Sequence, residues 1–143
     1  SIVARVYEET NTWVTYGTYI EYPTGLSPDW IVDFPATVIE RKQFRQHPFT
    51  SSHLRTFKRF LLSSIGEEEF CYTDDRGWGP TTKMGSRFFD RAGADVAVML
   101  PVLERAGERI TRIPQVLHVY NIANPQNDYK VHLQEQWDVD AIV

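Results

Sequence analysis

The sequence is poor in cysteine, has no long apolar run and shows no excess of positive charge. Its 143 residues contain one cysteine, Cys71, which excludes disulfides within the chain and zinc sites made of cysteines alone. This fits a cytoplasmic or other reducing compartment. No apolar run approaches the ~20 residues that cross a bilayer. With 15 Lys and Arg against 19 Asp and Glu, the chain has no general attraction to nucleic acid.

The chain does have enough apolar and aromatic residues to fold. Hydrophobic residues make up 42% and aromatic residues 13% of it, so we expect a single domain over residues 1–143 with its own core. The opening stretch Ile2–Glu9 predicts a helix, because its apolar residues gather on one side. We identify no N-cap before this helix, although helices normally begin with one. We therefore expect the chain to begin within an element, as a domain fragment would, with a disordered tail as the alternative.

Strand and helix patterns are interspersed along the rest of the chain. The expected elements are, in order, a strand over Thr12–Tyr22, a short strand over Thr37–Ile39, a helix from Ser51 or Ser52 to Ile65, a long loop over Glu67–Arg91, a helix from Ala94 or Asp95 to Gly107, strands over Arg109–Ile113 and Val116–Tyr120, and a short helix over Lys130–Trp137. Pro101 predicts a kink in the second of the longer helices. Together these patterns predict an α/β fold with a small mixed sheet and two or three packed helices.

Asp95 is the first candidate for chemistry. It follows Gly93-Ala94 at a predicted helix N-terminus, where free backbone N–H groups favour a carboxylate. A carboxylate held there can accept a proton from a hydroxyl as a general base. The alternative is an ordinary N-cap aspartate, which spacing alone favours.

A second candidate lies in Ser51–Lys58. His53 and Arg55 fall in the first turn of the predicted helix, near its positive end. That position suits an anionic ligand such as a diphosphate. A solvated basic helix face is the plainer interpretation.

The third candidate is the polar run Tyr120–Lys130, which follows the last predicted strand. Its length and composition predict an Asx-rich turn, which is either structural or the wall of a pocket at a strand end. The candidate binding residues there are Asn121, Asn124, Asn127, Asp128 and Lys130. In the long loop, Trp78 can stack on a sugar ring or pin the loop to the core. Asp74-Asp75 is more typical of a surface turn than of a metal site.

Four motifs in a fixed order resemble a known family. They are Thr-Tyr-Gly-x-Tyr (Thr15–Tyr19), Ser-His-Leu-Arg-Thr-Phe-Lys (Ser52–Lys58), Asp-x-Ala-x-x-x-Pro-x-Leu-Glu-x-Ala-Gly (Asp95–Gly107) and Val-Tyr-Asn-x-x-Asn-Pro-x-Asn-Asp-x-Lys (Val119–Lys130). Each motif is weak alone. In this order they resemble the C-terminal, acceptor-side half of family-2-type glycosyltransferases with the GT-A fold, in their viral and bacterial branch.

The resemblance implies transfer of a sugar from a nucleotide-diphosphate donor to an acceptor hydroxyl. It implies that Asp95 is the acceptor-side base, and that the second and third segments line the donor or acceptor pocket. The family's nucleotide-binding units and aspartate-any-aspartate metal motif precede this region, and neither lies upstream of Trp13. We therefore expect a partial domain that is inactive alone, with the ligands of its Mn²⁺ or Mg²⁺ mostly outside this chain.

Two other classes stay open. The chain could be a non-catalytic module that binds carbohydrate or another protein, in which case Asp95 only caps its helix. It could also be one chain of a two-chain enzyme whose partner holds the nucleotide. An incomplete sheet has an exposed edge, which favours pairing in a homo-oligomer or with a missing half.

Overall fold

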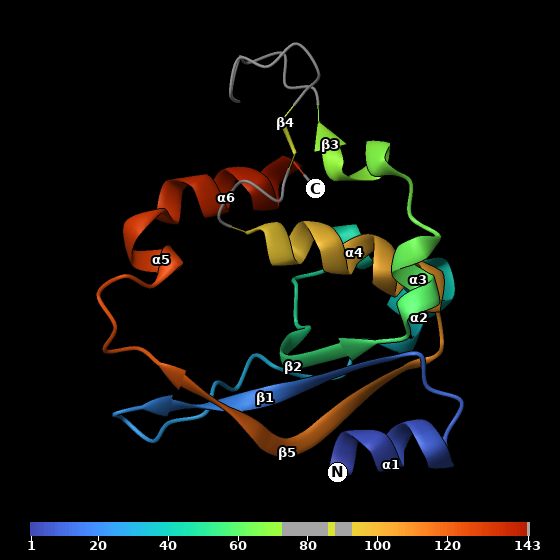
Figure 1. The fold of residues 1–143 in the computed structure, drawn as a ribbon, viewed down its shortest axis with the longest axis horizontal. Coiled ribbons are helices and arrows are strands. Elements are labelled where there is room, and N and C mark those ends of the chain that lie inside the picture. The colour runs from blue at the N-terminus through green and yellow to red at the C-terminus, as the bar shows by residue number, and fades with distance from the viewer. Residues whose placement is uncertain (73–85, 88–92, 143) are drawn as a thin grey trace.

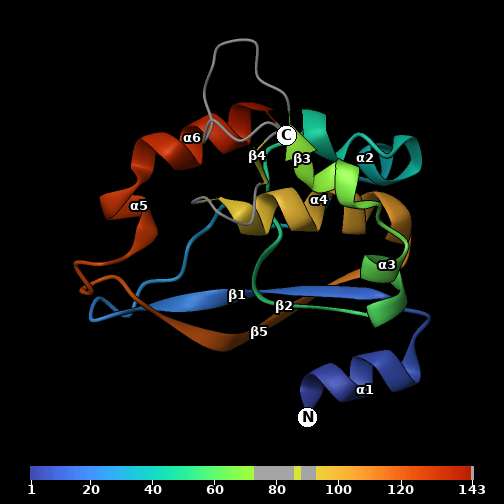
Figure 2. The ribbon, with the colours of Figure 1, turned by 45° about the horizontal axis from the view of Figure 1, so that its top comes forward.

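The protein is an α/β structure built around a small mixed sheet. The computed structural model describes residues 1–72, 86–87 and 93–142. Its elements are α1 (Ile2–Glu9), β1 (Val14–Tyr22), α2 (Ala36–Arg41), the 3-10 helix η1 (Phe44–Gln46), β2 (Ser52–Phe57), α3 (Arg59–Ser63), the 3-10 helix η2 (Glu67–Phe70), β3 (Cys71–Tyr72), β4 (Ser86–Arg87), α4 (Ala94–Ala106), β5 (Ile110–Asn121), α5 (Asp128–Val131) and α6 (Leu133–Ile142). Figure 1 and Figure 2 show α4 on one side of the sheet and α1 on the other.

The main sheet has the strand order β2-β1-β5, with β1 in the centre. β1 pairs antiparallel with β2 and parallel with β5. β3 and β4 form a separate two-stranded antiparallel sheet. The predicted α/β class with a small mixed sheet is therefore confirmed.

Irregular pairing in β1 changes which side chains face α4. The register with β5 shifts between Gly17 and Thr18 and again between Thr18 and Tyr19. Tyr16 lies in the core with α4, whereas regular alternation would next place Thr18 on that face. The bulge turns Tyr19 to this face instead, where Tyr19 lines a pocket.

The core lies between the sheet and α4. Val102 and Leu103 of α4 are fully buried, as is Val14 of β1. Tyr16 is also buried, and its hydroxyl donates to the carbonyl of Val32 at 2.8 Å. Burial is the largest cause that raises the pKa of Tyr16 to about 12, so the hydroxyl stays protonated. This bond fixes the loop that follows β1 against the sheet.

The opening helix is present, and the statement that no N-cap precedes it is wrong. Ser1 is the N-cap of α1, and its side chain accepts a hydrogen bond from the backbone N of Ala4 at 3.2 Å. The sequence therefore contains the N-cap that its pattern did not reveal. Tyr7 ties α1 to the sheet, because its hydroxyl lies 3.0 Å from that of Thr56.

The helix expected from Ser51 or Ser52 to Ile65 is wrong in its first half. Ser52–Phe57 forms strand β2, and only Arg59–Ser63 is helical. The apolar spacing of Leu54 and Phe57 matched a helix, but pairing with the central strand decides the conformation, with Val14 opposite Phe57. Tertiary pairing therefore overrides the local pattern.

The remaining expectations are partly confirmed. Thr37–Ile39 is not a strand but part of α2, which follows Pro35, a residue suited to a helix start. The two strands predicted before Tyr120 are one strand, β5, whose pairing skips from Ile113 to Val116 around Pro114.

α4 runs over Ala94–Ala106 as predicted and continues past Pro101. The last helix is split into α5 and α6 and is longer than expected. Most of the predicted loop Glu67–Arg91 lies outside the described residues.

Candidate functional site

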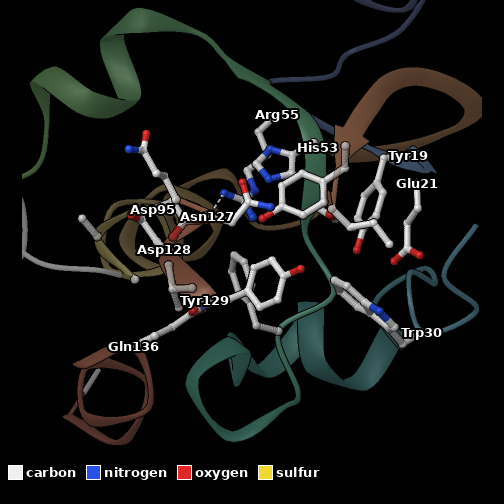
Figure 3. Close-up of a pocket in the computed structure, with 18 residues that line it drawn as sticks. Tyr19, Glu21, Trp30, His53, Arg55, Asp95, Asn127, Asp128, Tyr129 and Gln136 are labelled. Atoms are coloured by element: carbon white, nitrogen blue, oxygen red, sulfur yellow. Dashed lines mark hydrogen bonds and ion pairs between the residues drawn. The ribbon is translucent and has the colours of Figure 1, made fainter. Parts of the chain in front are cut away.

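A pocket of about 890 Å³ opens between the sheet and helices α4, α5 and α6. Figure 3 shows the side chains that line it. The three segments singled out in the sequence all contribute to it, although they are far apart along the chain. The lining residues are Tyr19, Glu21, Trp30, Phe49, Ser52, His53, Arg55, Gly93, Ala94, Asp95, Val96, Tyr120, Ile122, Gln126, Asn127, Asp128, Tyr129 and Gln136.

An ion pair between Arg55 and Asp95 joins two of these segments. Nη1 of Arg55 donates to Oδ2 of Asp95, and Nε donates to the carbonyl of Ser51 at 2.6 Å. The guanidinium also lies over the Phe49 ring, 5.3 Å from its centroid. The Arg55 side chain is 14% exposed and that of Asp95 48%. A nearly buried, anchored arginine therefore holds a carboxylate that solvent and a ligand can reach.

Asp95 is not the cap of its helix. The N-cap of α4 is Gly93, whose positive φ of 85° suits glycine, and Asp95 lies in the first turn. Its carboxylate bonds to Arg55, so this side chain joins the helix to β2. The capping interpretation is thus replaced by an ion pair that faces the pocket.

Aromatic rings form much of the rest of the wall. The Tyr19 and Tyr120 rings are 5.3 Å apart, and the His53 ring is stacked parallel to that of Tyr120 at 6.2 Å. The Tyr129 ring lies 6.3 Å from that of Tyr120. Burial raises the pKa of both Tyr19 and Tyr120. Their hydroxyls therefore stay neutral and can donate hydrogen bonds to a ligand.

The basic segment does not lie at a helix N-terminus, although the sequence predicted that it would. His53 and Arg55 lie in strand β2 and not at a helix N-terminus, so no helix dipole adds to their charge. The charge of Arg55 is matched by Asp95. Burial, helped by the charges of Arg55 and His118, lowers the pKa of His53, which is therefore mostly neutral at pH 7. The helix N-terminus on which we based diphosphate binding is therefore absent at these two residues, and diphosphate binding by them stays a prediction.

The Asx-rich loop divides into pocket residues and residues that shape the loop. Asn127 and Asp128 line the pocket, but Asn121, Asn124 and Lys130 do not. The side-chain oxygens of Asn121 and Asn124 each accept a backbone N–H two residues further on, at 3.0 Å. The ammonium of Lys130 donates a hydrogen bond to the carbonyl of Ile122. These three residues hold the turn, as the structural interpretation had it. Trp78 and Asp74-Asp75 lie outside the described residues.

Several lining residues were missed in the sequence. Tyr19 and Glu21 are two positions apart in β1 and so share a face, as His53 and Arg55 do in β2. A correct strand assignment for Ser52–Phe57 would have shown that shared face. Trp30 and Gln136 come from a loop and from α6, and no local pattern marked them.

The pocket by itself does not make up a metal site. Within the described ranges, His, Cys, Asp and Glu do not gather in any group of three that could hold a metal ion. Asp95 and Asp128 are the carboxylates that α4 and α5 contribute to the pocket wall.

Comparison of the chain with protein-family models, curated proteins and solved structures finds no match in any of the three. Across the part of the chain that the structure describes, no helix is long and apolar enough to cross a membrane.

The neutral state of His53 predicts a pH dependence of stability. Its pKa is lowered in the folded protein, so the unfolded chain binds a proton first as the pH falls below about 6.5. The free energy of unfolding should therefore decrease between that pH and the lower folded pKa. Urea denaturation at a series of pH values should show this loss, and His53→Gln should make it smaller. An unchanged slope in His53→Gln would show that other groups cause it.

Proposed function

We propose that the pocket is the acceptor site of a glycosyltransferase and that Asp95 is its general base. The observation that carries the proposal is the convergence of three motif segments around one cavity, with the Asp95 carboxylate held at its wall by Arg55. Motif order alone does not require the segments to meet. Their meeting is expected if the motifs belong to one site.

In the proposed reaction, residues of this chain carry out one proton transfer. An acceptor hydroxyl in the pocket gives its proton to the Asp95 carboxylate while its oxygen forms a bond to the anomeric carbon of the donor. The bond from that carbon to the diphosphate breaks, and the nucleoside diphosphate leaves with the electron pair. Because Arg55 donates a hydrogen bond to Oδ2, we assign Oδ1 as the oxygen that accepts the proton. A base positioned this way contributes about 10²- to 10⁴-fold.

The pocket chemistry favours a hydroxylated acceptor over a nucleotide diphosphate. Asn127, Gln126 and Gln136 supply amides that donate and accept hydrogen bonds, and the tyrosine rings offer flat apolar faces. Arg55, the one guanidinium among the described lining residues, is already paired with Asp95. We propose that the donor nucleotide and its Mn²⁺ or Mg²⁺ are held by residues other than those of this pocket.

A non-catalytic carbohydrate-binding module is the second candidate. The specific observation in its favour is the aromatic wall of Tyr19, Tyr120 and Tyr129, which can bind a sugar ring without any chemistry. The two candidates predict the same binding site. They differ in whether Asp95 changes turnover.

Chemical-shift mapping on the 143-residue chain tests the binding site that both candidate functions share. Titration with short neutral, basic and acidic saccharides should shift amide signals of residues 19–21, 52–55, 93–96 and 122–129. Signals of α2, which contributes no lining residue, serve as the internal control. Shifts centred elsewhere, or none with any saccharide, would remove the acceptor-site assignment.

A further inference from the structure

The charges in the pocket wall are unbalanced. Three carboxylates and one guanidinium are among the lining residues, and that guanidinium is paired with Asp95. Neither Glu21 nor Asp128 has a cationic partner among the described residues. Oε2 of Glu21 accepts only a long hydrogen bond from Thr24, at 3.3 Å. Within the described residues, the wall therefore carries two carboxylates, those of Glu21 and Asp128, whose charge no cation balances.

The two carboxylates lie at opposite ends of an aromatic wall. Figure 3 shows Glu21 beside Tyr19 and Trp30, with Asp128 across the pocket near Asp95 and Tyr129 between the two ends. The Trp30 side chain is substantially exposed, and burial keeps the Tyr19 hydroxyl protonated. The face of an aromatic ring carries partial negative charge and attracts cations. The aromatic rings and the carboxylates therefore both favour a cationic ligand over a neutral or anionic one.

Among the residues that the structure describes, two further basic side chains lie near the pocket, and neither balances the charge of Glu21 and Asp128. His53 is mostly neutral at pH 7, because burial lowers its pKa. Lys130 is outside the lining, and its ammonium is bonded to the Ile122 carbonyl beside the Tyr129 ring. An anionic ligand such as a uronic acid would meet Glu21 and Asp128, and the described part of the wall offers it no unpaired cation.

We propose that this pocket selects an acceptor that carries a protonated amine, such as an amino sugar, over neutral and acidic saccharides. The inference rests on the proposed acceptor site and names its substrate class. The sugar ring lies against the tyrosines, and the ammonium pairs with Glu21 or Asp128. A partly exposed ion pair and a cation–π contact of this kind together increase affinity about three- to tenfold.

The test compares matched ligands on the 143-residue chain. The probes are the methyl glycosides of glucosamine, glucose and glucuronic acid, at a pH where both the carboxylates and the amine are charged. Calorimetry or titration by NMR should give about three- to tenfold tighter binding for the glucosaminide than for the glucoside, and the weakest binding for the glucuronide. Added salt should reduce the difference.

Substitutions of Glu21 and Asp128 test whether these two carboxylates cause the preference for the glucosaminide. Glu21→Gln and Asp128→Asn keep shape and hydrogen-bonding capacity, and the double variant should bind glucosaminide and glucoside equally. Glu108→Gln is the matched control, because Glu108 is exposed and outside the lining. Equal affinities in the unmodified chain, or a preference that survives in the double variant, would overturn the inference and leave the acceptor site standing. Failure of all three probes to bind would count against the acceptor site itself.

Discussion

Asp95→Asn should lower the rate of glycosyl transfer at least about a hundredfold while changing acceptor affinity by no more than a few-fold. Asparagine has the shape of aspartate and can still accept the hydrogen bond from Arg55, so the wall keeps its form. It cannot take a proton from an acceptor hydroxyl. The measurement is kcat and acceptor KM of the protein that contains these residues, with a labelled nucleotide sugar, together with acceptor binding by calorimetry.

Asp33→Asn is the matched control for this change. Asp33 is also an aspartate paired with an arginine, Arg112, at 3.2 Å, but it lies outside the pocket and its side chain is 72% exposed. Its replacement should leave turnover within about twofold, because an exposed ion pair contributes little. If Asp95→Asn kept full turnover, the general-base role would be lost and Asp95 would only join α4 to β2.

Gly17→Ala should destabilise the protein by about 1–3 kcal/mol and disturb the pocket. A Cβ atom on Gly17 would lie 3.1 Å from the carbonyl oxygen of His53 and 3.2 Å from the backbone N of Leu54. Both contacts are with backbone, which cannot turn aside as a side chain can. β2 must therefore shift, and with it His53 and Arg55. Urea denaturation gives the stability, and the His53 ring signals in NMR report the shift.

Gly25→Ala separates this collision from an ordinary glycine effect. Gly25 has a φ of 72°, which disfavours alanine, but an added Cβ would have nothing within 4 Å. We expect a loss of about 1 kcal/mol with the His53 signals unchanged. If Gly17→Ala moved those signals no more than Gly25→Ala does, close packing at Gly17 would not be what positions the pocket segment of β2.

The elements that the sequence predicted correctly are those whose local and tertiary preferences agree. α4 has an apolar stripe that the core requires and glycines just outside both ends, so its bounds follow from spacing. β1 is dense in β-branched and aromatic residues and is the central strand. Ser52–Phe57 has no such agreement, because its spacing fits a helix while the edge of β1 needs a partner.

The site was predictable only as separate segments. Asp95 and Arg55 could each be singled out from the chain, but a pairing across 40 positions leaves no local signal. The aromatic wall depends on the irregular pairing near Gly17, which brings Tyr19 to the face that Tyr16 occupies. Trp30 reaches the pocket from a loop that the Tyr16 hydroxyl fixes at Val32. Such long-range contacts exist only once the fold has formed.

Product analysis tests the central claim most directly. The protein that contains these residues is to be supplied with labelled nucleotide sugars and an amino-sugar acceptor that occupies the pocket. The account predicts a new glycosidic bond to an acceptor hydroxyl and an equal amount of released nucleoside diphosphate. Binding of the acceptor in the pocket without any product from any donor would contradict it, and would identify the pocket as a carbohydrate-binding site with no catalytic role.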